Sequence, residues 1–173
     1  MILDRHNRVN SAELYARLRS TDAKVAEGDY ISELPNDQID DFVNMMQVYE
    51  GAMYEISTKL EILDSEFQVR FSHDPIHHME RRLKSVHSIF EKLHRRNLDI
   101  STHAIRDNLF DVAGIRVICN YRDDVYAVAQ YLSEQTDIQV LQVKDYIKNP
   151  KPNGYRSLHV IYACLLYTSL MAR

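Results

Sequence analysis

The chain has 173 residues, of which 45% are hydrophobic, and a formal net charge of −4. This size suits one domain with a real core, and no apolar run approaches the roughly 20 residues that span a bilayer. A general DNA- or RNA-binding protein would be basic throughout, so nucleic acid is not indicated as a partner. The two cysteines make no disulfide framework and the first residues lack a signal-peptide stretch, so we expect a cytoplasmic protein.

The net charge hides an asymmetry along the chain. Residues 1–70 carry 14 acidic and 7 basic side chains, whereas residues 78–106 carry seven basic and three acidic ones. A local positive patch of this kind fits a small polyanion, and a solvated basic helix face is the alternative interpretation.

The first 36 residues are interpreted as a polar N-terminal extension, with a short helix expected over Ser11 to Arg19. From about Asp37, apolar residues recur every three or four positions, which predicts one amphipathic helix of roughly 30 residues. They are Phe42, Met45, Tyr49, Met53, Ile56, Leu60, Leu63 and Phe67. A helix of this length must pack against its own sheet or a partner subunit.

A second apolar pattern follows Pro75 and predicts another helix. It comprises Ile76, Met79, Leu83, Val86, Ile89, Phe90 and Leu93. Arg82 and Lys84 lie two positions apart, which favours a chain that is extended there or just entering the helix. Residues 97–109 are expected to form a loop and a short helix.

The second half of the chain alternates strand and helix patterns. Strands are expected over residues 111–121, 138–143 and 158–163, and a helix over residues 123–134. This order predicts an α+β fold in which helices pack on a mixed or antiparallel sheet.

Residues 147–159 read Ile-Lys-Asn-Pro-Lys-Pro-Asn-Gly-Tyr-Arg-Ser-Leu-His. Cations at Lys148, Lys151 and Arg156 can neutralise phosphate, Gly154 allows close approach of the backbone, and Tyr155 offers a ring that stacks on a base. The segment therefore indicates a bound nucleotide. A polar surface loop stays open as the alternative, because Pro-Asn-Gly is ordinary turn chemistry.

Asp111 stands at the start of a predicted strand, next to the small residues Ala113 and Gly114. Mg²⁺ usually takes one or two protein carboxylates and completes its shell with phosphates and water, so Asp111 is a candidate metal ligand. A simple turn-forming role is the alternative. Arg116, five positions later, would point to the opposite face of a regular strand.

Ser85, Ser88 and Lys92 follow one another by one helical turn and can converge as a phosphate cradle near a helix start. N-capping with solvation is the alternative. No cysteine or carboxylate completes a zinc site with the histidines near residue 77, and Cys119 is interpreted as a small buried residue.

Several ordered motifs between Met53 and Ile161 together resemble the RelA/SpoT-type alarmone synthetases, and within them the small single-domain members. They are Arg82-Leu-Lys-Ser, Ser88-Ile-Phe-Glu-Lys-Leu, Asp111-Val-Ala-Gly-Ile-Arg-Val-Ile-Cys and Lys144-Asp-Tyr-Ile-Lys-Asn-Pro-Lys-Pro-Asn-Gly-Tyr-Arg-Ser-Leu-His.

The resemblance implies a nucleotidyltransferase-like mixed β-sheet flanked by helices. It also implies a GTP pyrophosphokinase of the stringent response, which transfers the β,γ-diphosphate of ATP to the 3′-hydroxyl of GTP or GDP and makes (p)ppGpp and AMP. Mg²⁺ would be the cofactor, and a homo-oligomer is expected because relatives form tetramers.

The resemblance also implies roles for single residues. Asp111 would bind the metal and, with Arg82 and Lys84, act in catalysis. ATP would be bound by Arg82, Lys84, Ser88, Lys92 and Arg116, with the two arginines around the adenine. GTP or GDP would be bound by Lys144, Lys148, Lys151, Tyr155, Arg156 and His159, with Tyr155 stacked on the guanine.

The sequence departs from the family pattern after Tyr162. The family continues there into a strand with Glu-x-Gln-x-Arg-Thr, which carries a second metal carboxylate, and this chain does not. Residues 37–162 are therefore expected to be an incomplete synthetase domain and residues 163–173 an unrelated tail. We expect this chain to be weakly active or inactive. The alternatives are a non-catalytic nucleotide- or RNA-binding regulator and a helical interaction module over residues 37–68.

Overall fold

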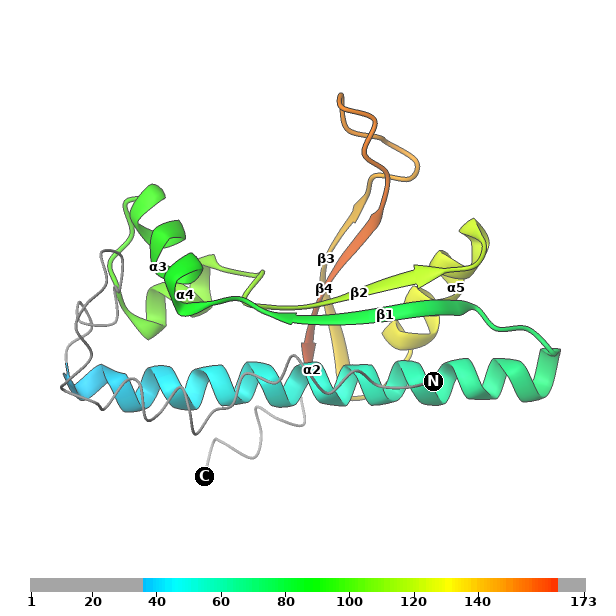
Figure 1. Cartoon of the computed structure of the whole chain (residues 1–173), viewed down its shortest axis with the longest axis horizontal. Coiled ribbons are helices and arrows are strands. Elements are labelled where there is room, and N and C mark those ends of the chain that lie inside the picture. The colour runs from blue at the N-terminus through cyan, green and yellow to red at the C-terminus, as the bar shows by residue number, and fades with distance from the viewer. Residues whose placement is uncertain (1–35, 165–173) are drawn as a thin grey trace. The chain divides into compact units, whose positions relative to one another are not determined.

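The structure, a computed structural model, describes residues 36–164. Its elements are α2 (Asn36–Phe71), β1 (Ile76–Leu83), α3 (Val86–Arg95), α4 (Thr102–Asn108), β2 (Ala113–Cys119), α5 (Arg122–Ser133), β3 (Ile138–Asp145) and β4 (Leu158–Cys164) (Figure 1). The α+β class and the long N-terminal amphipathic helix are confirmed. The helix expected over residues 11–19 lies outside the described residues. Within residues 36–164, no helix is both long and apolar enough to cross a membrane.

The strands of the described residues form two two-stranded sheets, β1 with β2 and β3 with β4. The second pair is antiparallel. The first pair carries backbone hydrogen bonds at both ends, from Asn120 N to Pro75 O (3.1 Å) and from Lys84 N to Val112 O (2.7 Å). These bonds fit an antiparallel ladder. Small antiparallel sheets are thus present, in line with the mixed or antiparallel sheet that the order of elements predicted.

The helix predicted from Ile76 onward is wrong over its first half, where β1 forms. The apolar spacing of Ile76, Met79 and Leu83 imitates a helix, yet from Met79 to Leu83 the side chains alternate between half-buried and exposed. That period of two results from pairing with β2, a contact that a local pattern does not contain. Helix α3 begins only at Val86, behind its N-cap Ser85. The extended chain expected at Arg82 is therefore confirmed.

The described residues divide into two compact units, residues 36–51 with 81–114 and residues 52–80 with 115–164. In the first unit, the beginning of α2 packs with α3, α4 and the residues before β2. The fully buried side chains include Phe42, Met45, Ile89, Phe90, Leu93, Ile105, Leu109 and Val112. The rings of Phe42 and Phe90 lie 5.5 Å apart between centroids. The apolar faces of three helices thus make one core.

The second unit has its own core between the later part of α2, helix α5 and β3. It is formed by Leu60, Leu63, Ile76, Val128, Leu132 and Ile138. The backbone N–H of Ile76 donates to Asp64 Oδ1 at 3.0 Å, which ties the start of β1 to α2. At the side of this core, the ring of Phe67 meets Tyr131 edge-on at 5.1 Å.

Strands β3 and β4 run side by side as a hairpin, which Figure 1 shows in orange and red. Their register pairs Ile138 with Cys164 and Asp145 with Leu158, and it shifts between Val140 and Gln142. Leu141 is the extra residue of this β-bulge. The loop of residues 146–157 begins directly beyond the last pair, so the hairpin presents this loop at its end.

Replacing Phe90 with alanine tests the first core. Phe90 is fully buried, so F90A leaves a cavity and should lower the free energy of unfolding by about 3–5 kcal/mol, as measured by urea denaturation. F110A is the matched control because Phe110 is 60% exposed in the same unit, and it should cost less than about 1 kcal/mol. Equal losses in the two variants would contradict this core.

Candidate functional site

Three charged side chains from separate segments meet in the first unit. Lys84 follows the end of β1, Lys92 lies on α3, and Asp111 lies in the turn before β2. The Nζ atoms of Lys84 and Lys92 lie 2.8 and 2.6 Å from the same carboxylate oxygen, Asp111 Oδ2. We call these three residues the lysine–carboxylate cluster. The tertiary structure thus brings together three residues that the sequence identified only as separate candidates.

The lysine–carboxylate cluster carries a net positive charge, because two ammonium groups share one carboxylate. The two lysine side chains are largely buried, whereas that of Asp111 is 50% exposed. Partial burial by itself would raise the pKa of Asp111, but the hydrogen bonds from Lys84 and Lys92 outweigh it and leave the pKa below its ordinary value. Asp111 is therefore ionised at neutral pH, and its Oδ1 takes no part in these two bonds.

Helix α3 begins beside the lysine–carboxylate cluster in the sequence. The Ser85 oxygen accepts the backbone N–H of Ser88 at 3.3 Å, and its hydroxyl donates to Ser88 Oγ at 2.9 Å. No acidic side chain occupies the first turn of the helix. The positive end of the helix dipole therefore has no carboxylate of its own there. The capping contact is present, and phosphate binding by Ser88 stays a prediction.

The cluster offers a metal ion a single carboxylate. Within residues 36–164, no group of three or more His, Cys, Asp or Glu side chains is placed to hold a metal. One half-exposed carboxylate fits a hard cation such as Mg²⁺, which draws most of its ligands from water and substrate phosphates. The same single oxygen ligand does not fit a structural zinc site, which takes four protein ligands.

In the second unit, the loop of residues 146–157 has a defined backbone. Lys151 N donates to Tyr155 O at 3.2 Å, and Gly154 N donates to Lys151 O at 2.8 Å. Gly154 has a φ of 80°, in the left-handed region that side chains disfavour. The Pro-Asn-Gly segment is therefore the tight turn that its composition indicated.

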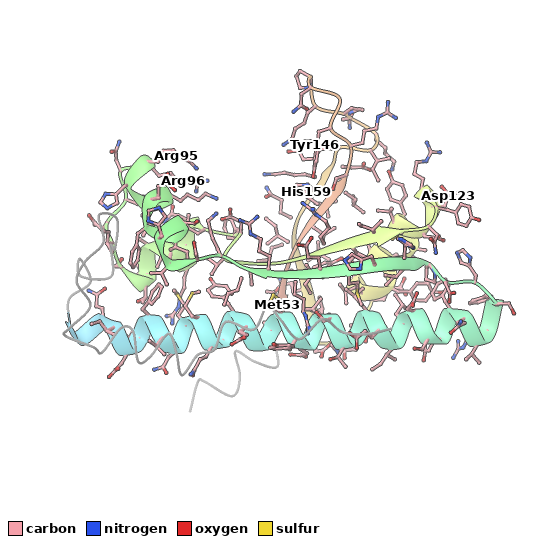
Figure 2. All side chains as sticks on the ribbon, viewed as in Figure 1. Met53, Arg95, Arg96, Asp123, Tyr146 and His159 are labelled. Atoms are coloured by element: carbon pink, nitrogen blue, oxygen red, sulfur yellow. The ribbon has the colours of Figure 1, made fainter. Side chains whose placement is uncertain are left out.

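Three rings and one ammonium group gather around this loop. Tyr146 lies edge-on to His159 with ring centroids 5.3 Å apart. Figure 2 labels both residues on the β3–β4 hairpin. The Tyr155 hydroxyl lies 2.9 Å from His159 Nε2. Lys151 Nζ lies 4.7 Å from the Tyr146 ring centroid and 5.1 Å from that of Tyr155. We call these four residues the aromatic–lysine cluster.

Electrostatics keep His159 uncharged in this cluster. Burial, and then the positive charges of Lys151 and Lys144, lower the pKa of His159 below its ordinary value. The imidazole is therefore neutral at neutral pH, and its Nε2 shares a hydrogen bond with the Tyr155 hydroxyl in which the tautomer sets the donor. The Tyr155 side chain is fixed by this bond while the residue remains 43% exposed.

The remaining predicted site residues are the arginines, Lys144 and Lys148. Lys144 is exposed on β3, where it pairs with His159 on β4. Arg82 is exposed on β1, in the first unit, and Arg156 is exposed in the loop. Arg116 is exposed on β2, in the second unit, with its NH1 3.7 Å from Glu80 Oε2. Such an exposed ion pair is weak and yields readily to a ligand. Lys148 lies 3.7 Å from Asp145.

Sequence reasoning missed Tyr146, Asp145 and Tyr126 as parts of the loop's surroundings. Tyr146 lies nine positions before Tyr155, and only the hairpin register shows that their rings meet. Tyr126 is on α5 and reaches Asp145 across 19 positions. The sequence Lys144-Asp145-Tyr146 at the start of the loop was a signal, but it does not show which helix residue contacts Asp145.

Comparison with known proteins gives the family. A family model described as a region found in RelA / SpoT proteins matches residues 81–170, which include the lysine–carboxylate cluster and the β3–β4 loop. The chain belongs to the RelA/SpoT family. The resemblance on which the sequence analysis relied is confirmed.

The relatives of this RelA/SpoT chain agree with that assignment. The chain is 41% identical over 123 residues to the GTP pyrophosphokinase YwaC of Bacillus subtilis, covering 71% of this chain and 59% of the relative. It is 33% identical over 120 residues to the GTP pyrophosphokinase YjbM of the same organism, covering 69% of this chain and 56% of the relative.

Solved structures agree with the fold. Small alarmone synthetase 2 of B. subtilis matches with a TM-score of 0.62 and 39% identity, covering 72% of this chain and 62% of that one. Small alarmone synthetase 1 of B. subtilis bound to its product pppGpp matches with a TM-score of 0.63 and 31% identity, covering 70% and 61%. The RelA/SpoT chain described here thus spans about three-fifths of the length of these relatives.

Removing the carboxylate of Asp111 tests the lysine–carboxylate cluster. We expect D111N to lower the free energy of unfolding at neutral pH by about 1 kcal/mol, because two ammonium groups then face each other at a partly solvated site. Since the folded pKa of Asp111 is lowered, its contribution is present above the ordinary carboxyl pKa and is lost as pH falls through the folded value.

Urea denaturation of both proteins between about pH 7 and pH 3 measures this difference. The stability gap between wild type and D111N should shrink as pH falls. D107N is the matched control, since Asp107 is a 55% exposed carboxylate on α4 of the same unit. A gap for D111N that stays constant down to the lowest pH would contradict the proposed electrostatics.

Proposed function

We propose that this RelA/SpoT protein is an ATP:GTP/GDP 3′-pyrophosphotransferase that makes (p)ppGpp. The observation that carries the proposal is the lysine–carboxylate cluster within the segment that matches the family. Two largely buried ammonium groups and one ionised carboxylate provide both charges needed to bind a metal-associated polyphosphate. Relatives named GTP pyrophosphokinase and a relative bound to pppGpp support this choice.

The proposed donor site lies around the lysine–carboxylate cluster. Lys84, Lys92 and Ser88 would bind ATP phosphates, Asp111 would hold Mg²⁺ through its carboxylate, and Arg82 and Arg116 would enclose the adenine. When bound, Mg²⁺ would neutralise phosphate charge and so polarise the bond to the transferred group. The lysines add fixed positive charge where negative charge develops.

The proposed acceptor site lies at the β3–β4 loop. Tyr155 would stack on the guanine, because its ring is exposed and held by His159. Lys144, Lys148, Lys151, Arg156 and His159 would lie near the acceptor phosphates. Because Lys151 rests over the rings of Tyr146 and Tyr155, a stacking base must share or displace it. Phosphate binding offers Lys151 a stronger partner than a ring face.

An assay of group transfer tests the proposed activity. With labelled ATP and GTP in Mg²⁺, the chain should release AMP and form a new guanine nucleotide at a low rate, in keeping with the weak activity expected from its sequence, and EDTA should abolish both. K84M should lower kcat/KM at least about a hundredfold, since removing one charge from a transition-state site costs roughly that much. K59M is the control, because Lys59 makes an ion pair of the same 2.8 Å length with Asp137 in the second unit.

The outcomes separate the candidate functions. Binding of ATP or GTP without AMP release would favour the non-catalytic regulator. If the chain showed no nucleotide binding and no turnover, both proposals would be refuted. Equal losses in K84M and K59M would remove the lysine–carboxylate cluster from the chemistry.

Substitution of Tyr155 tests the acceptor assignment. Y155A should raise the KM for GTP at least about tenfold while the KM for ATP changes little, because base–ring stacking is worth about 1–3 kcal/mol. Y155F is the control that keeps the ring and loses only the bond to His159. Equal effects of Y155A on the two KM values would remove Tyr155 from the guanine site.

A further inference from the structure

We propose that Tyr126 and Asp145 are positioning residues that hold the β3–β4 loop in the shape that binds the acceptor nucleotide. This inference rests on the proposed function and adds a residue from helix α5, outside the segment that the nucleotide would touch. The Tyr126 hydroxyl lies 3.3 Å from Asp145 Oδ1 and 3.1 Å from Oδ2, so it donates to the carboxylate as a whole. The contact joins α5 to the last residue of β3.

The Asp145 carboxylate in turn fixes the start of the loop. Its Oδ1 accepts the backbone N–H groups of Ile147 at 3.0 Å and Lys148 at 2.9 Å. Its backbone carbonyl accepts the N–H of Asn149 at 3.1 Å. An aspartate that binds the amides two and three positions later sets the direction of the following turn. Asp145 therefore determines where the chain leaves the hairpin.

The same contacts place a cation. Lys148 Nζ lies 5.2 Å from the Tyr126 ring centroid and 3.7 Å from Asp145 Oδ2. The side chain of Lys148 is 72% exposed, whereas that of Asp145 is only 19% exposed. The carboxylate is thus a fixed, mostly buried anchor, and the ammonium group stays accessible to a phosphate.

Charge distribution agrees with this arrangement. The backbone hydrogen bond from Lys148, with further help from Tyr126 and Ile147, keeps the pKa of Asp145 below its ordinary value despite burial. Burial and the adjacent Asp145 raise the pKa of Tyr126, so its hydroxyl keeps its proton and remains a donor. One ionised acceptor and one permanent donor hold the loop across the whole neutral range.

These contacts have a consequence for binding. The loop contributes Lys148, Lys151 and Tyr155 to the proposed acceptor site, and a displaced turn at its start would alter the position of the residues that follow. Preorganised binding groups lose less conformational entropy when the ligand arrives, which appears as affinity. Tyr126 should therefore influence the KM for the acceptor and leave the ATP side unaffected.

The variant Y126F tests the proposal, because it removes one hydroxyl and keeps the ring that Lys148 contacts. We expect the KM and the Kd for GTP to rise roughly three- to tenfold, the effect of one lost hydrogen bond, while kcat and the KM for ATP stay within about twofold. Amide hydrogen exchange at Ile147 and Lys148 should accelerate by a similar factor. D145N should act in the same direction.

Y131F is the matched control. Tyr131 lies on the same helix and packs its ring on Phe67, so the same change there leaves the Asp145 contacts intact. It should alter neither GTP binding nor exchange at Ile147 and Lys148. Unchanged GTP affinity in Y126F would overturn the proposal. So would a loss of kcat with accelerated exchange throughout the chain, which would indicate general destabilisation.

The test separates this proposal from the proposed function. If wild type releases no AMP, the transferase proposal fails, and the Kd for a fluorescent GTP analogue still decides the role of Tyr126. A higher Kd for the GTP analogue in Y126F than in Y131F supports the positioning role of Tyr126. Equal Kd values in the two variants, or no binding of the analogue by wild type, overturn that role.

Discussion

The apolar stripe of helix α2 is the constraint on which the rest of this structure depends. Its early residues, among them Phe42 and Met45, complete the core of the first unit, and Leu60 and Leu63 complete that of the second. Each buried Leu or Phe contributes about 1.5–3 kcal/mol, so both candidate sites are built on elements that one helix keeps in place.

Both candidate sites hold lysine ammonium groups in place through contacts within the protein. In the first unit, Asp111 keeps Lys84 and Lys92 side by side against their mutual repulsion. In the second, ring faces hold Lys151. For Lys151, a phosphate would offer a charge-assisted hydrogen bond that is stronger than the ring contacts it replaces. Lys84 and Lys92 already donate such bonds to Asp111, so a phosphate there would have to share them with the carboxylate.

The two sites differ in how their geometry is maintained. The lysine–carboxylate cluster comes from regular elements and from the turn next to them, so the cores fix it. The β3–β4 loop has no core of its own, and a short ladder of local bonds replaces one: the turn at Gly154, the bond between Tyr155 and His159, and the Asp145 carboxylate. Tyr126 ties that ladder to helix α5. A loop of this kind can adapt to its ligand and still be positioned by a single distant hydroxyl.

The sequence by itself determined the helices α2 and α5, the strands after Asp111, the tight turn at Gly154 and the family, because periodicity, turn chemistry and ordered motifs are local properties. It misjudged Ile76 to Leu83, where apolar spacing favours a helix and pairing with β2 imposes a strand. Only the tertiary structure decided that Lys84 and Lys92 share one oxygen of Asp111, that Tyr146 meets Tyr155, and that Tyr126 supports the loop. These contacts join residues separated by 9 to 27 positions, as the ring contact of Tyr155 with Tyr146 and the hydrogen bond of Lys84 to Asp111 show. No local pattern encodes such a separation, since the fold alone sets which elements become neighbours.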